Sequence, residues 1–142
     1  MNLLRIIRIS RPIGYVVAPI VFLAPILLYN IEISSIILIQ LALLTFPLCF
    51  LIFGINDIYD IETDKKNPRK GGVEGAILKE REIKTVQEIA ALCAILLFIP
   101  ILLRPDLLTL ASTVLIIFLT YTYSAPPLRL KERPPFDSIS NS

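Results

Sequence analysis

Residues 46–64, FPLCFLIFGINDIYDIETD, join an apolar run directly to a string of carboxylates. The apolar part belongs to an uncharged stretch from Ile33 to Asn56. About 20 apolar residues suffice for a helix to cross a bilayer, so this stretch predicts a membrane-spanning helix. The carboxylates then mark the point where that helix leaves the membrane.

Three further uncharged stretches flank this one, at Pro12–Ile31, Ile89–Leu103 and Leu107–Leu128. The shortest is expected to gain a first turn containing Lys84 and Glu88, because long charged side chains can reach the interface. Of the 142 residues, 55% are hydrophobic and 18% charged, which is too apolar for an ordinary soluble domain. We predict an all-α integral membrane bundle of about four transmembrane helices, kinked at its prolines.

The basic residues predict the orientation of the chain. Thirteen of the fourteen Lys and Arg residues fall on one side of a four-span topology, and Arg104 is the exception. Basic residues favour the cytoplasmic side, so we expect a multi-pass cell-membrane protein with a cytoplasmic N-terminus and cytoplasmic loops at about 56–84 and 124–142. Arginines spaced by three at positions 5, 8 and 11 predict an amphipathic segment on the membrane surface.

The composition excludes several kinds of chemistry. The chain has no histidine, which rules out histidine metal sites and Ser-His-Asp or Cys-His catalysis on its own residues. Cys49 and Cys93 both lie in apolar runs, as small buried side chains do. Membrane lipid is the expected surrounding, and no nucleic-acid partner is expected.

The carboxylates after residue 55 predict a metal site. If the helix continues without a break, Asn56, Asp57, Asp60 and Asp64 fall at about 0°, 100°, 40° and 80° on one face, whereas Glu62 points elsewhere. Carboxylates that converge at a membrane boundary repel one another unless cations neutralise them.

Oxygen ligands suit Mg²⁺, which is usually held by one or two carboxylates together with substrate phosphates. We therefore predict that these four residues bind Mg²⁺ in a metal-bridged diphosphate site. Nearby Lys65, Lys66, Arg69 and Lys70 could supply further positive charge. The alternative is a solvated acidic helix end followed by a basic stop-transfer cluster.

A second group of polar residues follows the last apolar stretch, where residues 123–131 read YSAPPLRLK. Pro126 and Pro127 should end the helix. The ring of a tyrosine in this stretch, Tyr121 or Tyr123, could stabilise a cationic intermediate, and the lysine and arginines of the loop could neutralise a departing diphosphate. Interfacial tyrosines with ordinary positive-inside charges explain the composition equally well.

The two motifs together resemble the UbiA superfamily of membrane prenyltransferases. Arg11-Pro12 looks like the N-terminal signature of that family, and the tail from Lys131 to Asn141 looks more like its lycopene elongase subgroup. The resemblance implies a nine-helix bundle around a lipid-facing cavity, with two aspartate-rich motifs that bind Mg²⁺. Residues 1–142 would form the N-terminal part of this single domain, with only the first of the two motifs.

The resemblance also implies roles for individual residues in the transfer of a prenyl group from a prenyl diphosphate to a hydrophobic acceptor within the membrane. Catalytic roles fall to Asp57, Asp60, Asp64, Tyr123 and Lys131. Substrate-binding roles fall to Arg11, Asn56, Arg69, Arg129 and Asn141. The main alternative is a non-catalytic fragment, or half of a split protein that needs a second polypeptide with the missing motif. A small ion transporter or scaffold is a third hypothesis.

Overall fold

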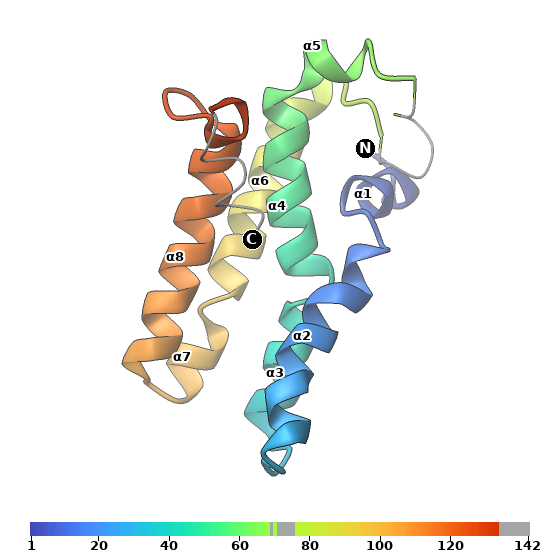
Figure 1. The fold of residues 1–142 in the computed structure, drawn as a ribbon. Helices are drawn as coiled ribbons and strands as arrows, with labels where there is room; N and C mark the ends of the chain where they lie inside the picture. Colours follow the sequence, from blue (N-terminus) through green and yellow to red (C-terminus); the bar gives the residue numbers. More distant parts are fainter. Residues whose placement is uncertain (69, 71–75, 134–142) are drawn as a thin grey trace.

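The computed structural model describes residues 1–68, 70 and 76–133, and every regular element in these ranges is helical (Figure 1). The elements follow one another as α1 Leu3–Ile9, α2 Gly14–Leu28, α3 Ser35–Leu43, α4 Phe46–Tyr59, α5 Ile61–Asp64, η1 Glu80–Glu82, α6 Ile83–Leu96, α7 Ile99–Leu103, α8 Leu107–Ser124 and η2 Leu130–Glu132.

Three helical segments of the described chain are long and apolar enough to cross a membrane: Ser35–Tyr59, Glu80–Leu103 and Leu107–Ser124. A fourth crossing results if α1 and α2, which meet at a bend of 52°, are counted as one span. Large apolar side chains on these segments face outward, as a lipid environment requires. The prediction of an all-α membrane bundle with about four spans is confirmed.

Prolines mark the breaks within the spans. Pro47 lies in the first turn of α4, just after the break from α3, and Pro100 has the same place in α7 after α6. Pro12 lies in the bend between α1 and α2. α8 ends at Ser124, before Pro126, as predicted, because the residue before a proline disfavours the helical conformation.

The core lies where α4 packs against α6. Phe50 and Leu51 of α4 and Val86 and Cys93 of α6 are almost fully buried there. Gly54 allows this close approach, because a Cβ atom at its position would lie 3.2 Å from Cγ1 of Val86. α4 is the central helix of the described chain, since α1, α2, α3, α6 and α8 all contact it.

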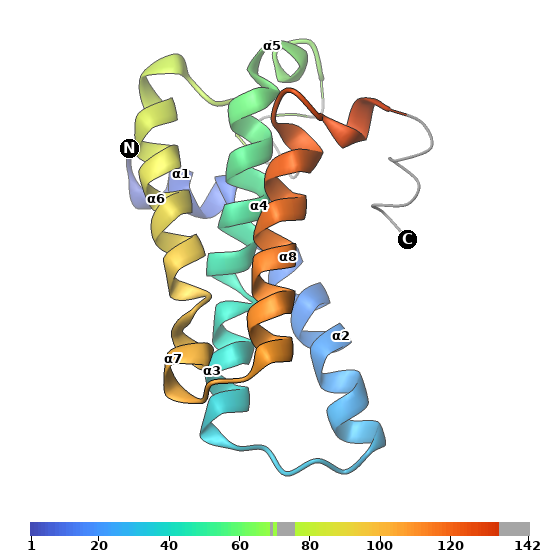
Figure 2. The same ribbon diagram turned by 90° about the vertical axis from the view of Figure 1, so that its left-hand side faces the viewer.

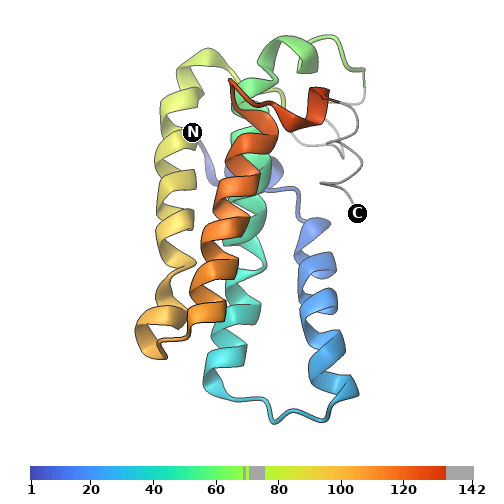
Figure 3. The same cartoon turned by 60° about the vertical axis from the view of Figure 1, so that its left-hand side comes forward.

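The long helices α4, α6 and α8 run side by side, and α2 stands beside them (Figures 2 and 3). α1 crosses the direction of the long helices part of the way along them, and α5 and the turn after α8 lie at one end of the bundle (Figure 2). We call this the motif end. The loop between α2 and α3 and the turn between α7 and α8 form the opposite, distal end (Figure 3).

The predicted unbroken helix through residues 56–64 is wrong at one residue. Asp60 has φ −109° and ψ 9°, so α4 ends before it and α5 begins after it. Aspartate is a weak residue in a helix interior, and the Asp60 carboxylate is held by Lys131 and Arg129 from beyond α8. The break separates Asp60 from the other two aspartates.

Candidate functional site

Asp57 is the most deeply buried carboxylate of the motif end, with a fully buried side chain. Its Oδ1 atom accepts from Arg11 Nη2 at 3.0 Å and from Lys70 Nζ at 2.7 Å. Lys70 also lies 2.6 Å from Oδ2 of Asp64, so one ammonium group joins two carboxylates. The Oδ2 atom of Asp57 is buried and accepts no hydrogen bond from the described residues.

Asp60 has a separate set of partners at the ends of α4 and α8. Lys131 Nζ lies 2.5 Å from both of its carboxylate oxygens and also donates to Oδ1 of Asn56 at 3.1 Å. Arg129 Nη2 lies 3.4 Å from Asp60 Oδ1. Ser124 donates to the same Asn56 oxygen at 3.1 Å, which ties the end of α8 to α4.

Two site arginines have an uncommon backbone conformation. Arg11 has φ 49° and Arg129 has φ 40°, in the left-handed region that non-glycine residues rarely adopt. Arg11 stacks over the ring of Phe53, 4.4 Å from its centroid. Because such conformations persist only where surrounding contacts hold them, both turns are candidates for a functional role.

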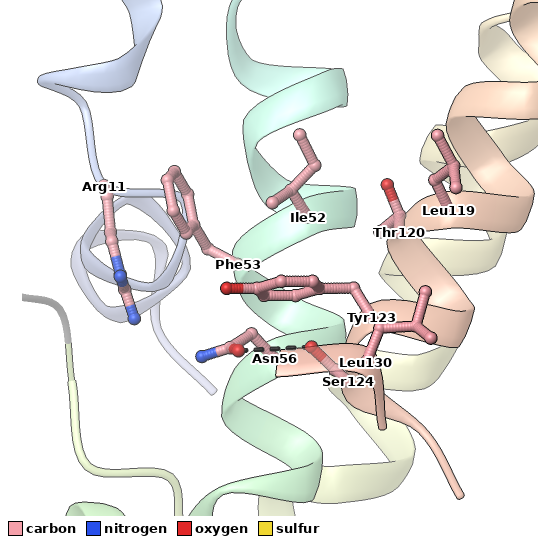
Figure 4. A pocket seen from close by; sticks show the side chains of 9 residues that line it. All are labelled: Arg11, Ile52, Phe53, Asn56, Leu119, Thr120, Tyr123, Ser124 and Leu130. Carbon is pink, nitrogen blue, oxygen red and sulfur yellow. Dashed lines mark hydrogen bonds between the residues drawn. The ribbon is translucent and has the colours of Figure 1, made fainter. Parts of the chain in front are cut away.

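A half-open cavity of about 490 Å³ lies beside these ion pairs, between α4 and α8. Arg11, Asn56, Tyr123 and Ser124 line its polar side, and apolar residues such as Ile52 line the rest. Tyr123 points from α8 across the cavity toward Phe53 and Arg11 (Figure 4). We call this the proximal cavity. Its shape suits a ligand with an apolar body and a charged end.

Four cationic side chains contact the three aspartates: Arg11, Lys70, Arg129 and Lys131. Arg129 also lies 2.8 Å from Oε1 of Glu132, so four cations face four carboxylates and the charges of the described cluster balance. Cationic side chains bind phosphate oxygens strongly, so this cluster suits a phosphate ligand whose negative charge a metal ion offsets.

The donor atoms also fit Mg²⁺, although no three acidic side chains of the described ranges lie close enough together to hold a metal ion by themselves. Asp57 and Asp64 share Lys70, and Asp57 Oδ2 remains unpartnered among described residues. A pair of carboxylates suffices for Mg²⁺ when substrate phosphates complete the set. Magnesium binding itself stays a prediction.

Glu62 does not belong to the cluster, in agreement with the sequence. Its side chain is 79% exposed and pairs with Lys65 at 2.6 Å. The hydrogen bond from Lys65 lowers the pKa of Glu62 below its usual value. This surface pair serves as a control for experiments on the buried aspartates.

The structure brings together eight of the ten predicted site residues, and the other two, Arg69 and Asn141, lie outside the described residues. Three contributions were not predicted: the bridge made by Lys70, the ring of Phe53 under Arg11, and the bond from Ser124. Of these three residues, only Lys70 could have been identified from the sequence, because it is one of four cations that follow the acidic stretch. The other two depend on distances between helices.

Comparison with known proteins shows which sequences this chain is similar to. Residues 16–142 match the UbiA prenyltransferase family. A lycopene elongase/hydratase of Corynebacterium glutamicum is 33% identical over the whole chain, which covers 50% of that protein. A second, from Halobacterium salinarum, is 35% identical over 67% of the chain and 33% of its own length.

A C(50) beta-cyclic carotenoids biosynthesis protein of a Dietzia species, LbtBC, is 38% identical over 68% of the chain and 22% of its own length. The chain thus spans about half the length, or less, of these curated relatives. No solved structure gives a significant match. Because the family match covers most of its residues, including both motifs of the site, the chain belongs to the UbiA prenyltransferase family.

Proposed function

We propose that these residues form the diphosphate- and Mg²⁺-binding part of a prenyltransferase that transfers a prenyl group from a prenyl diphosphate to a hydrophobic acceptor in the membrane. The observation that carries this proposal is the group of four cations that contacts Asp57, Asp60 and Asp64 beside a largely apolar cavity. A diphosphate at this edge would meet cationic side chains while its prenyl group enters the cavity.

Each polar residue then has a separate task. Lys131 and Arg129 bind diphosphate oxygens after turning from Asp60, and Arg11 does so from the opposite side of the cavity. Asp57 and Asp64 would hold Mg²⁺, with Asp60 and Asn56 next to them. Bound Mg²⁺ would neutralise the negative charge that develops on the leaving diphosphate.

The apolar lining would bind the prenyl group and exclude water. Ile52 and Leu119 lie on the two walls of the proximal cavity, and Tyr123 reaches across it. The π face of Tyr123 would stabilise positive charge on the allylic carbon as its bond to the diphosphate oxygen breaks. A double bond of the acceptor then forms a carbon–carbon bond with that carbon. The positive charge left on the acceptor would be removed by addition of a water molecule, which loses a proton and leaves a hydroxyl group.

The relatives' names suggest the acceptor. Two are named for lycopene elongation and hydration, so we propose a linear polyene as acceptor and a hydroxyl group on the finished end of the product. The second aspartate-rich motif of the family would come from a further segment or from a second polypeptide. The site would face the cytoplasm, as the distribution of basic residues predicts.

The test uses the protein that contains these residues in lycopene-accumulating cells, with membranes then supplied with isotope-labelled dimethylallyl, geranyl or geranylgeranyl diphosphate and Mg²⁺. We expect label in a heavier carotenoid, lost on chelation of Mg²⁺ and reduced at least a hundredfold in Asp60→Asn. The Glu62→Gln variant should retain the activity, since Glu62 pairs only at the surface. Normal labelling by Asp60→Asn would contradict the proposal.

A further inference from the structure

Lys70 is the most deeply buried of the four cations that contact the aspartates, and it joins two carboxylates from different elements. Its side chain is 5% exposed, compared with 13% for Lys131, which pairs with Asp60. Its Nζ atom lies 2.7 Å from Oδ1 of Asp57 in α4 and 2.6 Å from Oδ2 of Asp64 in α5. One ammonium group thus stands between the two aspartates that are proposed to hold Mg²⁺.

Two consecutive turns bring Lys70 back to the aspartates after α5. The backbone N–H of Asn67 donates to the carbonyl of Asp64 at 3.1 Å, and the N–H of Lys70 donates to the carbonyl of Asn67 at 3.2 Å. Pro68 comes directly after Asn67, where proline favours such a turn because its ring fixes the backbone angle. A local turn therefore sets the place of this ammonium group.

Each of the two aspartates has a carboxylate oxygen that Lys70 leaves without a hydrogen bond. Oδ2 of Asp57 is buried and accepts none from the described part of the chain. Oδ2 of Asp64 is buried too, and its contact with Lys70 lacks the geometry of a hydrogen bond. An ammonium group donates only along its N–H bonds, whereas Mg²⁺ accepts oxygen ligands all around it. These two oxygens therefore suit a metal ion better than they suit the lysine.

Arg11 can hold Asp57 in place when Lys70 leaves it. Arg11 Nη2 donates to the same Oδ1 atom at 3.0 Å, and its guanidinium group stacks on the ring of Phe53. Loss of the contact with Lys70 would therefore leave Asp57 with one charged partner. Because an unpaired buried carboxylate is costly, this second partner makes an exchange of cations feasible at this position.

The charge of the cluster indicates when such an exchange is favourable. Its four cations face four carboxylates, so the cluster within the described residues is already neutral. Mg²⁺ that binds alone must break the ion pairs of Lys70 and leaves positive charge in excess. A diphosphate brings negative charge that offsets both the metal and the released ammonium group. The metal and the diphosphate should therefore bind better together than separately.

We propose that Lys70 is an internal counter-ion that occupies the place of Mg²⁺ between Asp57 and Asp64 before ligands bind, and moves to a phosphate oxygen when Mg²⁺ and the prenyl diphosphate bind together. This inference rests on the proposed function, which places both ligands at this cluster. Lys70 would thereby couple the two ligands: the metal alone competes with its ammonium group, and the diphosphate removes this competition by binding it.

The first test measures Mn²⁺ binding without diphosphate, by electron paramagnetic resonance of the free ion, in the purified protein that contains these residues. Binding that is lost in Asp64→Asn belongs to this site. We expect Lys70→Gln to bind Mn²⁺ about 10- to 100-fold more tightly than the wild type, because the metal no longer competes with a charge-assisted pair. A merely structural role of Lys70 predicts the opposite sign, since a loosened site binds the metal more weakly.

Two further variants control for charge. Lys70→Arg keeps a cation beside the aspartates and should bind Mn²⁺ as weakly as the wild type. Lys65→Gln removes an equal charge from the same segment, where Lys65 pairs with Glu62 at the surface, and should leave Mn²⁺ binding unchanged. Equal or weaker Mn²⁺ binding by Lys70→Gln, compared with the wild type, would overturn the inference.

A second test needs no substitution. Amidination of lysines by methyl acetimidate, measured by mass spectrometry, reports how well each ammonium group is protected. We expect saturating Mg²⁺ to raise the rate at Lys70 roughly fivefold or more, and inorganic diphosphate added with Mg²⁺ to restore the protection, while Lys65 reacts at one rate throughout. A rate at Lys70 that Mg²⁺ does not change would contradict the exchange of cations.

The proposed function is tested separately in the same samples, with a fluorescent prenyl diphosphate analogue and Mg²⁺. A wild-type protein that does not bind this analogue would contradict the proposed function itself. A wild-type protein that binds it while Lys70 keeps its protection in Mg²⁺ alone would contradict only the role of Lys70.

Discussion

At the scale of single residues, the site depends on buried charges that compensate one another. Asp57 is fully buried, and Arg11 and Lys70 both contact its Oδ1 atom. Burying such groups is costly, so the arrangement is favourable only while each charge keeps its partner. Removing one charged side chain of the cluster should therefore affect the side chains that it contacts.

Replacing Asp57 by Asn should destabilise the fold by roughly 3–5 kcal/mol, since Arg11 loses its buried partner and Lys70 retains only Asp64. The measurement is the free energy of unfolding in mixed micelles. Glu62→Gln is the control, and its exposed side chain predicts little change. An Asp57→Asn protein as stable as the wild type would show that these contacts do not hold the motif end together.

Replacing Lys131 by Met should weaken prenyl diphosphate binding by about 10- to 100-fold, because charge-assisted hydrogen bonds contribute about 1.5–3 kcal/mol. The side chain is 13% exposed and already lies beside Asp60 at the cavity edge. Equilibrium binding of a fluorescent prenyl diphosphate analogue measures the effect. Lys65→Met removes an equal charge from the surface and should bind normally; equal losses in both variants would point to net charge instead.

At the scale of elements, each helix end has a local cause. Asp106 precedes α8, and its carboxylate accepts from the backbone N–H of Thr109 at 2.7 Å. This bond satisfies one of the unpaired N–H groups of the first turn. The same hydrogen bond lowers the pKa of Asp106 below its ordinary value.

Asp106→Ala should therefore loosen the first turn of α8, whereas Asp106→Asn, which still accepts a hydrogen bond, should retain it. Because the folded-state pKa is lowered, the contribution is present above the unfolded pKa and is lost as the pH falls through the folded one. Hydrogen exchange of the Thr109 amide measures the effect, with faster exchange expected in Asp106→Ala and in acid. Unchanged exchange in Asp106→Ala would contradict the role of this cap.

Helix ends also show how far the sequence could predict the fold. Apolar length predicted the spans, and Pro126 predicted the end of α8, because both signals are local. The break at Asp60 was missed, since it depends on Lys131 and Arg129, 71 and 69 residues away in sequence. The same holds for the site. The motif aspartates could be predicted because they are close in sequence, but the cation that pairs with each of them could not.

At the scale of the whole molecule, the three ion-paired aspartates lie at the motif end, and the distal end carries Glu32 in one connection and Arg104 with Asp106 in the other. Spans alone do not define a direction across the membrane. The imbalance of basic residues predicts one, because positively charged segments tend to be retained on the cytoplasmic side. The direction matters because it decides which compartment supplies the prenyl diphosphate.

We therefore expect Lys79→Cys, near the motif end, and Glu32→Cys, at the distal end, to be labelled from opposite sides of the membrane. The native Cys49 and Cys93 are buried, and replacing both by Ala removes their background. In intact cells an impermeant maleimide should label position 32 and leave position 79 unlabelled until the membrane is opened. The reverse pattern would place the carboxylate cluster outside the cytoplasm, where a soluble pool of prenyl diphosphate is not expected, and would contradict diphosphate as its ligand.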